Sequence, residues 1–295
     1  SIYFHFEEFI RIRTNDVAYG KGILSWYKLA LKHLRNFRPD ITFGEIDETF
    51  YSEFVTYLIK TKDMSNNTVG GHIKALKAFM KWAFDKNLTS NIKFLKFKNL
   101  SNDADTVCLN EKELSLLENI DLTVNPKLID VRNMFLIEIY TGLRVSDLLS
   151  LTKENFDMEN KIIRINIQKT RETLQIPIHT RLAAILEQYS ELKFPHFSKP
   201  YFNKQLKELC KQAGITELTQ TIKYQGTQRL IETKPKYELI SSHTARRSFI
   251  TLLIKKGAKA EMIMKITGHK KLTTMQKYVR ITENEALEAV RDAWD

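Results

Sequence analysis

Apolar side chains recur at the spacing of an α-helix in two stretches near the start of the chain, and this periodicity constrains the fold most. The first stretch, with steps of four, four and three residues, contains Ile23, Tyr27, Leu31 and Leu34. Residues 69–83 repeat the pattern, and a third apolar stripe runs through "DETFYSEFVTYLIK". Amphipathic helices bury such stripes against one another, so residues 1–90 are predicted to form a bundle of about four helices.

The rest of the chain combines helices with a short β-hairpin. Alternating apolar residues flank the turn "QKTRE", namely Ile163, Ile165, Ile167, Leu174, Ile176 and Ile178. This alternation predicts two antiparallel strands. The run "MFLIEIYTG" is typical of a buried helix that ends at Gly142, and "TQTIKYQGTQRLIETKPKYELIS" is predicted to be extended or a second hairpin. We expect a mainly α fold with a small antiparallel β component: a helical domain 1–90, a linker 91–107 and a mixed α/β domain 108–295.

Composition narrows the class of partner. The chain has 46 Lys and Arg against 35 Asp and Glu, a net charge of +11, which favours a polyanionic partner, nucleic acid before membrane. No stretch approaches the 18 or so apolar residues of a membrane span. The cysteines Cys108 and Cys210 lack a CxxC or His-rich context, which argues against disulfides and zinc and fits a reducing cytoplasm. Because the chain begins with Ser1 and not Met, we expect an N-terminal module to be absent.

Basic residues form stripes on two of the predicted helices and continue into the linker. The candidate DNA-binding residues are Lys28, Lys32, Arg35, Lys74, Lys77, Lys81, Lys93 and Lys96. A single stripe of this kind is more often a solvated helix face. Two stripes in one small basic bundle favour contacts to phosphates.

Common enzyme signatures are missing, since the sequence has no P-loop, GxGxxG, GxSxG or HExxH. Polar residues stand out instead in "YTGLRVSDLLSL", "SSHTARRSF" and "ITGHKKLTTMQKY", where they include Arg144, His243, Arg246, His269 and Tyr278. Each has an ordinary alternative: an arginine at a helix end, surface residues after a capping serine, or a core histidine. Asp147, one turn after Arg144, is expected to orient that arginine or another group of the site and not to act as a catalyst itself.

The combination of these residues and their order along the chain resemble the tyrosine recombinase (phage integrase) family. "TGLRVSDLLSL" is similar to the family's first arginine box, "HTARRSF" to its HxxR box and "GHKKLTTMQKY" to the box that ends in the nucleophile. The N-terminal bundle resembles the family's SAM-like core-binding domain. "TKPKYELISSHTARRSF" and "IMKITGHK" resemble integrases of mobile elements in the Bacteroides group. Two positions depart from the common pattern: Arg247 stands where many members have His, and Thr267 where Leu is common.

The resemblance implies a catalytic set of Arg144, Lys169, His243, Arg246, His269 and Tyr278. The tyrosine would form a covalent 3′-phosphotyrosyl link, while the arginines bind the non-bridging oxygens. The lysine, at the tip of the predicted hairpin, would protonate the leaving 5′ oxygen. The first histidine would assist proton transfer at the tyrosine, and the second would donate a hydrogen bond to the phosphate. No metal, ATP or other cofactor is expected.

The expected partner is double-stranded DNA, bound by a monomer that assembles into a homo-tetramer on synapsed sites, with host DNA-bending or directionality factors and no membrane. The expected location is the bacterial cytoplasm, at the nucleoid. A final amphipathic helix packs either in its own domain or on a neighbouring protomer; its apolar residues are Ala286, Leu287, Ala289, Val290 and Trp294. The alternatives are a type IB topoisomerase, a recombinase-fold DNA-binding protein that does not cleave, and a basic DNA-packaging protein.

Overall fold

The computed structural model describes residues 1–103, 107–167, 172–273, 275, 276 and 278. The chain divides into two compact units. The N-terminal unit contains Ser1–Asp105 with Thr221–Glu232, and the C-terminal unit contains Thr106–Gln220 with Thr233–Asp295. The described residues are mostly helical, with two small sheets. None of their helices is both long and apolar enough to cross a membrane.

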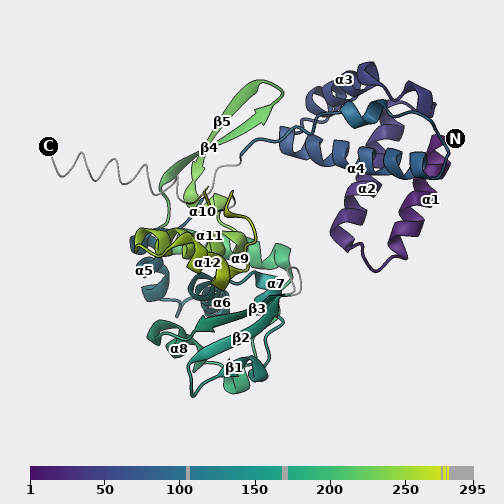
Figure 1. Ribbon diagram of the computed structural model, residues 1–295. Coiled ribbons are helices and arrows are strands. Elements are labelled where there is room, and N and C mark those ends of the chain that lie inside the picture. Colours follow the sequence, from purple (N-terminus) through teal and green to yellow (C-terminus); the bar gives the residue numbers. More distant parts are fainter. Residues whose placement is uncertain (104–106, 168–171, 274, 277, 279–295) are drawn as a thin grey trace. The chain divides into compact units, whose positions relative to one another are not determined.

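The N-terminal unit is the predicted helical bundle (Figure 1). Its elements are α1 (Ile2–Thr14), α2 (Lys21–Phe37), η1 (Phe43–Glu45), α3 (Glu48–Thr56), η2 (Tyr57–Thr61), α4 (Asn66–Asp85) and η3 (Lys93–Lys96). Helices α1 and α2 pack against each other and against α4. Aromatic rings fill the space between them, and Phe6 stacks on Phe79 with centroids 4.0 Å apart.

The apolar stripes predicted from the sequence account for most of this packing. On α4, every predicted stripe residue is buried: Val69, Ile73, Leu76, Met80 and Ala83. On α2, the last three predicted positions are buried, but Ile23 is 42% exposed. The prediction for Ile23 was therefore wrong, because this residue lies in the first turn of α2, and the core begins a turn later at Tyr27.

Part of the predicted linker is attached to α4. The Lys77 Nζ atom donates hydrogen bonds to the carbonyl oxygens of Leu95 (3.1 Å) and Phe97 (2.8 Å). A Cβ atom on Gly70 would lie 2.0 Å from the Leu100 carbonyl oxygen, so only glycine allows the chain to approach α4 this closely. The Asn66 amide donates to the Asn102 side-chain oxygen at 2.8 Å. Residues 95–102 thus extend the bundle.

The stretch predicted to be extended or a second hairpin forms the hairpin β4 (Leu218–Gln225) and β5 (Gln228–Pro235). Its turn belongs to the N-terminal unit. There Asn66 donates to the Gly226 carbonyl at 2.8 Å and accepts from the Gly226 N–H at 2.7 Å. This reciprocal pair satisfies the buried Asn66 amide.

The C-terminal unit surrounds a central buried helix. Its elements are α5 (Glu111–Asn119), α6 (Lys127–Thr141), α7 (Val145–Leu148), η4 (Lys153–Asn155), β1 (Phe156–Asp157), β2 (Ile162–Ile167), β3 (Glu172–Pro177), α8 (Thr180–Leu186), η5 (Ser190–Leu192), α9 (Lys199–Gln212), α10 (Lys236–Leu239), α11 (Ser242–Lys255) and α12 (Ala260–Thr267). Strands β1, β2 and β3 form an antiparallel sheet, in which Ile163 pairs with Ile176 as the predicted hairpin requires.

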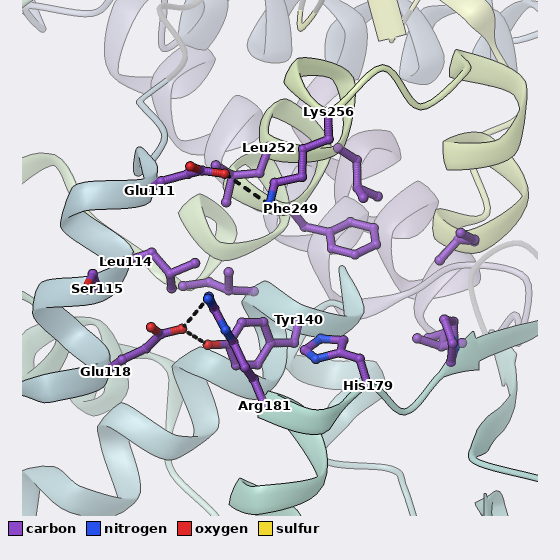
Figure 2. A pocket seen from close by; sticks show the side chains of 15 residues that line it. Glu111, Leu114, Ser115, Glu118, Tyr140, His179, Arg181, Phe249, Leu252 and Lys256 are labelled. Atoms are coloured by element: carbon purple, nitrogen blue, oxygen red, sulfur yellow. Dashed lines mark hydrogen bonds and ion pairs between the residues drawn. The ribbon is translucent and has the colours of Figure 1, made fainter.

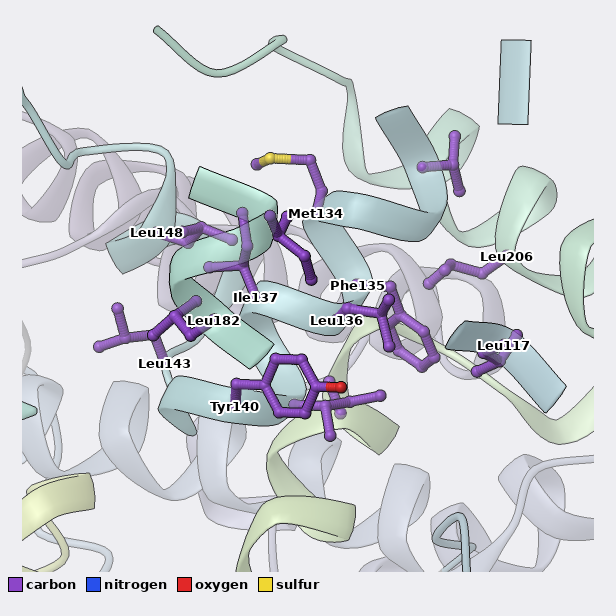
Figure 3. Packing of buried hydrophobic residues seen from close by; sticks show 14 of the residues in the cluster. Leu117, Met134, Phe135, Leu136, Ile137, Tyr140, Leu143, Leu148, Leu182 and Leu206 are labelled. Carbon is purple, nitrogen blue, oxygen red and sulfur yellow. The ribbon is translucent and has the colours of Figure 1, made fainter. Parts of the chain in front are cut away.

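Helix α6 lies at the centre of this unit, where it packs against α5, α8, α9 and α11. Figure 3 shows Phe135, Leu136 and Tyr140 of α6 in one cluster with Leu182 of α8 and Leu206 of α9. Nearly every residue in the second half of α6 is buried. The neighbouring helices therefore fix the direction in which α6 ends, and with it the segment that follows.

Candidate active site

The C-terminal end of α6 positions Arg144. The helix ends at Gly142, whose φ of +67° lies in the left-handed region that favours glycine. A Cβ atom here would lie 2.5 Å from the Phe249 ring of α11. Arg144 then caps α7, and its Nη1 atom lies 3.4 Å from Oδ2 of the buried Asp147. This ion pair holds the arginine close to the end of α6, as expected from the sequence.

Helix α11 contributes His243 and Arg246. A capping box starts the helix one residue before His243. Arg246 is one turn further on and only 1% exposed. Its Nη1 atom donates to the Gly142 carbonyl oxygen at 2.9 Å, and its Nη2 atom donates to the Thr267 carbonyl oxygen. The guanidinium is thus held by the residue that caps α6 and by the last residue of α12 before any ligand arrives.

His269 follows directly after α12. The helix ends at Gly268, which has a φ of +66°, and the His269 N–H donates to the Met264 carbonyl oxygen at 3.1 Å. The imidazole Nδ1 atom lies 2.7 Å from Thr267 Oγ1. Both ring nitrogens lie 3.2 Å from Arg246 Nη2. The left-handed glycine therefore turns the histidine back onto the buried arginine.

Tyr278 is 8% exposed and packs with Ile250, Ile263 and Met275. Burial lowers the pKa of the Arg246 guanidinium, and Tyr278 is close enough for its hydroxyl to oppose that shift in part. The predicted Lys169 lies outside the described residues. The sequence boxes at Arg144, Arg246 and the tyrosine therefore converge on one place in the C-terminal unit.

The electrostatics of this place favour an anion. We call Arg144, His243, Arg246 and His269 the anion site. Burial and the charge of Arg144 lower the pKa of Arg246 to about 10. Burial, followed by the charges of Arg246 and Arg144, lowers the pKa of His269 to about 4. Desolvation, followed by the charges of Arg247, Arg246 and Arg144, also lowers the pKa of His243, although this residue keeps an exposed surface. Positive charges that repel one another in this way are relieved when a phosphate binds.

A sequence profile described as "Phage integrase family" matches residues 108–285. The chain belongs to the phage integrase family. A second profile, "Phage integrase SAM-like domain", matches residues 3–99. The predicted fold is confirmed: a SAM-like helical domain precedes an integrase-family catalytic domain that contains a small antiparallel sheet.

Curated relatives and solved structures agree with this assignment. Tyrosine recombinase XerD of Oceanobacillus iheyensis is 26% identical over 292 residues, which cover 95% of this chain and 93% of the relative. XerD of Staphylococcus aureus is 23% identical over 295 residues, 95% of this chain and 94% of the relative. The Tn1549 transposon integrase in complex with a circular intermediate DNA has a TM-score of 0.70 at 18% identity, over 94% of both chains. A lambda integrase dimer bound to a COC' core site has a TM-score of 0.72 at 14% identity, over 93% of both chains.

The predicted DNA-binding residues of this integrase-family chain fall into two groups. Several have partners within the protein: Arg35 with Glu7, Lys81 with Asp85, Lys93 with Asp47, Lys96 with Glu48, and Lys77 with linker carbonyls. In the part of the chain that the structure describes, Lys28, Lys32 and Lys74 are exposed and have no such partner. Among the predicted DNA-binding residues, these three lysines have the least compensated charge.

A cavity of about 650 Å³ lies between α5, α6, α8 and α11, and its described lining does not include the anion site (Figure 2). Glu118 accepts hydrogen bonds there from the Tyr140 hydroxyl and from Arg181. Lys256 pairs with Glu111 at 3.1 Å. These polar groups are satisfied by one another. Among the described residues, no group of three or more His, Cys, Asp or Glu side chains is placed to hold a metal ion.

Glu138 is a buried carboxyl group that the apolar appearance of α6 conceals. It is 0% exposed, and neither carboxyl oxygen has a hydrogen-bond partner among the described residues. Burial raises its pKa well above the ordinary value, and the charge of Lys199 lowers it only in part. The folded protein therefore keeps Glu138 protonated at a pH where the unfolded chain has released the proton.

Glu138→Gln should change how stability depends on pH. Because the pKa is raised in the folded state, the wild-type protein should lose stability as pH rises above about 4.5, by at most about 1.4 kcal/mol per pH unit until the folded pKa is reached. The glutamine variant lacks this loss, so its stability relative to wild type should grow between about pH 5 and pH 8. Urea unfolding at both pH values measures the difference. Glu159→Gln, at an exposed position, serves as control. The prediction would be contradicted if the free energies of unfolding of Glu138→Gln and wild type differed by the same amount at both pH values.

Proposed function

We propose that this chain is a site-specific DNA recombinase that cleaves and rejoins strands through a covalent 3′-phosphotyrosyl intermediate on Tyr278. The observation that carries the proposal is the anion site. A buried arginine, held by two carbonyl oxygens, lies beside His269 and within the electrostatic reach of Arg144 and Tyr278. A phosphodiester bound there would meet fixed positive charge next to a nucleophile.

The chemistry follows from these residues. The Tyr278 oxygen attacks the phosphorus, the bond to the 5′ oxygen breaks, and the 3′ phosphate stays on the tyrosine. The tyrosine proton passes toward His243, and Lys169 supplies a proton to the leaving oxygen. Arg144 and Arg246 stabilise the charge that develops on the non-bridging oxygens. Attack by a 5′-hydroxyl from a second duplex reverses the steps and joins the new strands, so the reaction needs no ATP.

The proposed partner is duplex DNA. The Tn1549 and lambda integrase structures are DNA complexes, and one lambda structure is a tetramer bound to a Holliday junction. By analogy we propose a monomer that forms a tetramer on two synapsed sites. Exposed Lys28, Lys32 and Lys74 would contact phosphates, which predicts binding that weakens steeply with salt.

We further propose that the recombinase serves a mobile element and acts at the nucleoid in the bacterial cytoplasm, with host DNA-bending or directionality factors. The likeness of "TKPKYELISSHTARRSF" to integrases of the Bacteroides group supports the mobile-element role. The fold of the Tn1549 transposon integrase supports it as well. The C-terminal helix expected at residues 283–293 lies outside the described residues.

Trapping on nicked DNA tests the function. Nicked duplexes are prepared from DNA that flanks the protein's own gene, so that cleavage next to the nick releases a short fragment and prevents rejoining. We expect a denaturant-resistant protein–DNA adduct on a defined sequence, and Holliday junctions when intact duplexes replace nicked ones. Relaxation of any supercoiled plasmid without junctions would instead indicate a topoisomerase. Salt-sensitive binding with no adduct would indicate a binding protein that does not cleave.

A further inference from the structure

Thr267, one of the departures from the common family pattern, lies directly against the anion site. Its side chain is 0% exposed at the C-terminal end of α12. The Oγ1 atom lies 2.6 Å from the Ile263 carbonyl oxygen and 2.7 Å from His269 Nδ1. The Thr267 carbonyl oxygen also accepts from Arg246. This one residue therefore contacts both a buried arginine and a histidine of the proposed catalytic set.

The hydrogen atoms on these groups determine the direction of each bond. A threonine hydroxyl has one hydrogen and two acceptor lone pairs, whereas a carbonyl oxygen only accepts. The 2.6 Å approach to the Ile263 carbonyl therefore uses the hydroxyl hydrogen, as is usual for a threonine bonded back along a helix. The 2.7 Å contact to His269 then requires the hydrogen on Nδ1, which donates to Oγ1.

Arg246 does not select between the two neutral forms of the ring. A guanidinium can only donate, so it can bond only to a ring nitrogen that lacks hydrogen. Arg246 Nη2 is 3.2 Å from both Nδ1 and Nε2, so it favours neither nitrogen over the other. The choice between the forms therefore depends on the Thr267 hydroxyl.

We propose that Thr267 is a positioning residue that holds His269 in the Nδ1-protonated tautomer, so that Nε2 donates to a bound phosphate only after the ring takes up a second proton. The proposal rests on the proposed function, because it concerns how His269 meets the phosphodiester. Without the hydroxyl, the neutral ring is free to carry its hydrogen on Nε2 and to donate directly. A leucine at this position has no group that imposes the choice.

The charges around His269 determine when the second proton binds. Arg246, Arg144 and His243 face it. Burial lowers the pKa of His269 most, followed by the positive charges of the two arginines and by His243 when that ring is protonated. Across the adjoining cavity, α12 contributes Glu261 and Lys265, and β3 contributes Thr173 and Gln175, which do not ionise. The negative charge of a bound phosphate opposes the repulsion from the cations. Proton uptake is therefore expected to accompany DNA binding.

Nitrogen NMR of the imidazole rings tests the tautomer without relying on activity. The protein is labelled with ¹⁵N-histidine, and the His269 signals are assigned by comparison with His269→Asn. We expect the Nδ1-protonated pattern in wild type and in Thr267→Ser, which keeps the hydroxyl. In Thr267→Val, which has nearly the same shape, we expect a shift to the Nε2-protonated form or a mixture. An Nε2-protonated ring in folded wild type would overturn the proposal, and so would an unchanged ring in folded Thr267→Val.

Adduct formation on the nicked substrate gives a second measurement. If wild type needs doubly protonated His269, its cleavage rate should fall as pH rises. The rate of Thr267→Val should not fall for this reason. The ratio of the variant rate to the wild-type rate should therefore rise by up to about tenfold per pH unit. Thr267→Ser should follow wild type. A ratio that does not change with pH would overturn the proton-uptake step. If no protein forms an adduct, the function fails, while the NMR result still decides the tautomer.

Discussion

Tyr278→Phe should abolish the covalent protein–DNA adduct, a loss of more than about a thousandfold in cleavage, because the variant has no oxygen to attack phosphorus. The ring itself is retained, so the packing with Ile250, Ile263 and Met275 is kept and the fold should be preserved. DNA binding should stay within about twofold of wild type, since the proposed phosphate contacts come from other residues. Denaturing gels of the nicked-substrate reaction and mobility shifts measure the two quantities.

A second tyrosine provides the matched control for this variant. Tyr201 is 44% exposed and lies on α9, outside the anion site. Tyr201→Phe should therefore form the adduct at the wild-type rate. An adduct that persists in Tyr278→Phe would show that another residue is the nucleophile, and peptide mapping of the trapped DNA would identify it.

Arg246→Lys should reduce cleavage by about 10²–10³-fold, the usual effect of removing one donor that stabilises developing charge. The guanidinium donates to the carbonyl oxygens of Gly142 and Thr267 and still has N–H groups for a phosphate. A lysine ammonium is a single point donor and does not reproduce this planar geometry. Because the residue is 1% exposed, the loss of these bonds should also destabilise the fold by about 1–3 kcal/mol.

Single-turnover cleavage rates and urea unfolding separate the two effects of this substitution. The neighbouring Arg247→Lys changes the same chemistry at a position that is only partly buried and outside the anion site, so it should stay within a few-fold of wild type. If Arg246→Lys remained folded and cleaved within tenfold of wild type, the arginine would not be the principal phosphate ligand.

Much of the fold follows from local patterns in the sequence. The apolar stripe on α4, the strand alternation at Ile163 and Ile176, and the helix end at Gly142 reflect period and turn chemistry within a few residues. The attachment of the predicted linker to α4 was not foreseen. It depends on Lys77 reaching carbonyl oxygens 18 and 20 residues away, and a lysine in a basic stripe gives no local sign of that bond.

In the site, too, some features could be predicted from the sequence and others could not. The boxes around Arg144, Arg246 and Tyr278 could be recognised because their order and spacing are specific. The role of Thr267 could not, because it depends on where a hydroxyl hydrogen points within a folded turn. The only available signal was that a polar residue stands where leucine is common. The burial of Glu138 was even harder to predict, because a single acidic residue in an apolar run is usually on the exposed surface of a helix.

The two carbonyl bonds of Arg246 also have an entropic consequence. Ordering a long arginine side chain costs about 1.5–2 kcal/mol of rotamer freedom. In this chain that freedom is lost on folding, because the guanidinium is already bound to Gly142 and Thr267. In the proposed reaction an incoming phosphodiester would meet a rigid arginine, so more of the contact energy would be available for affinity and for stabilising the transition state.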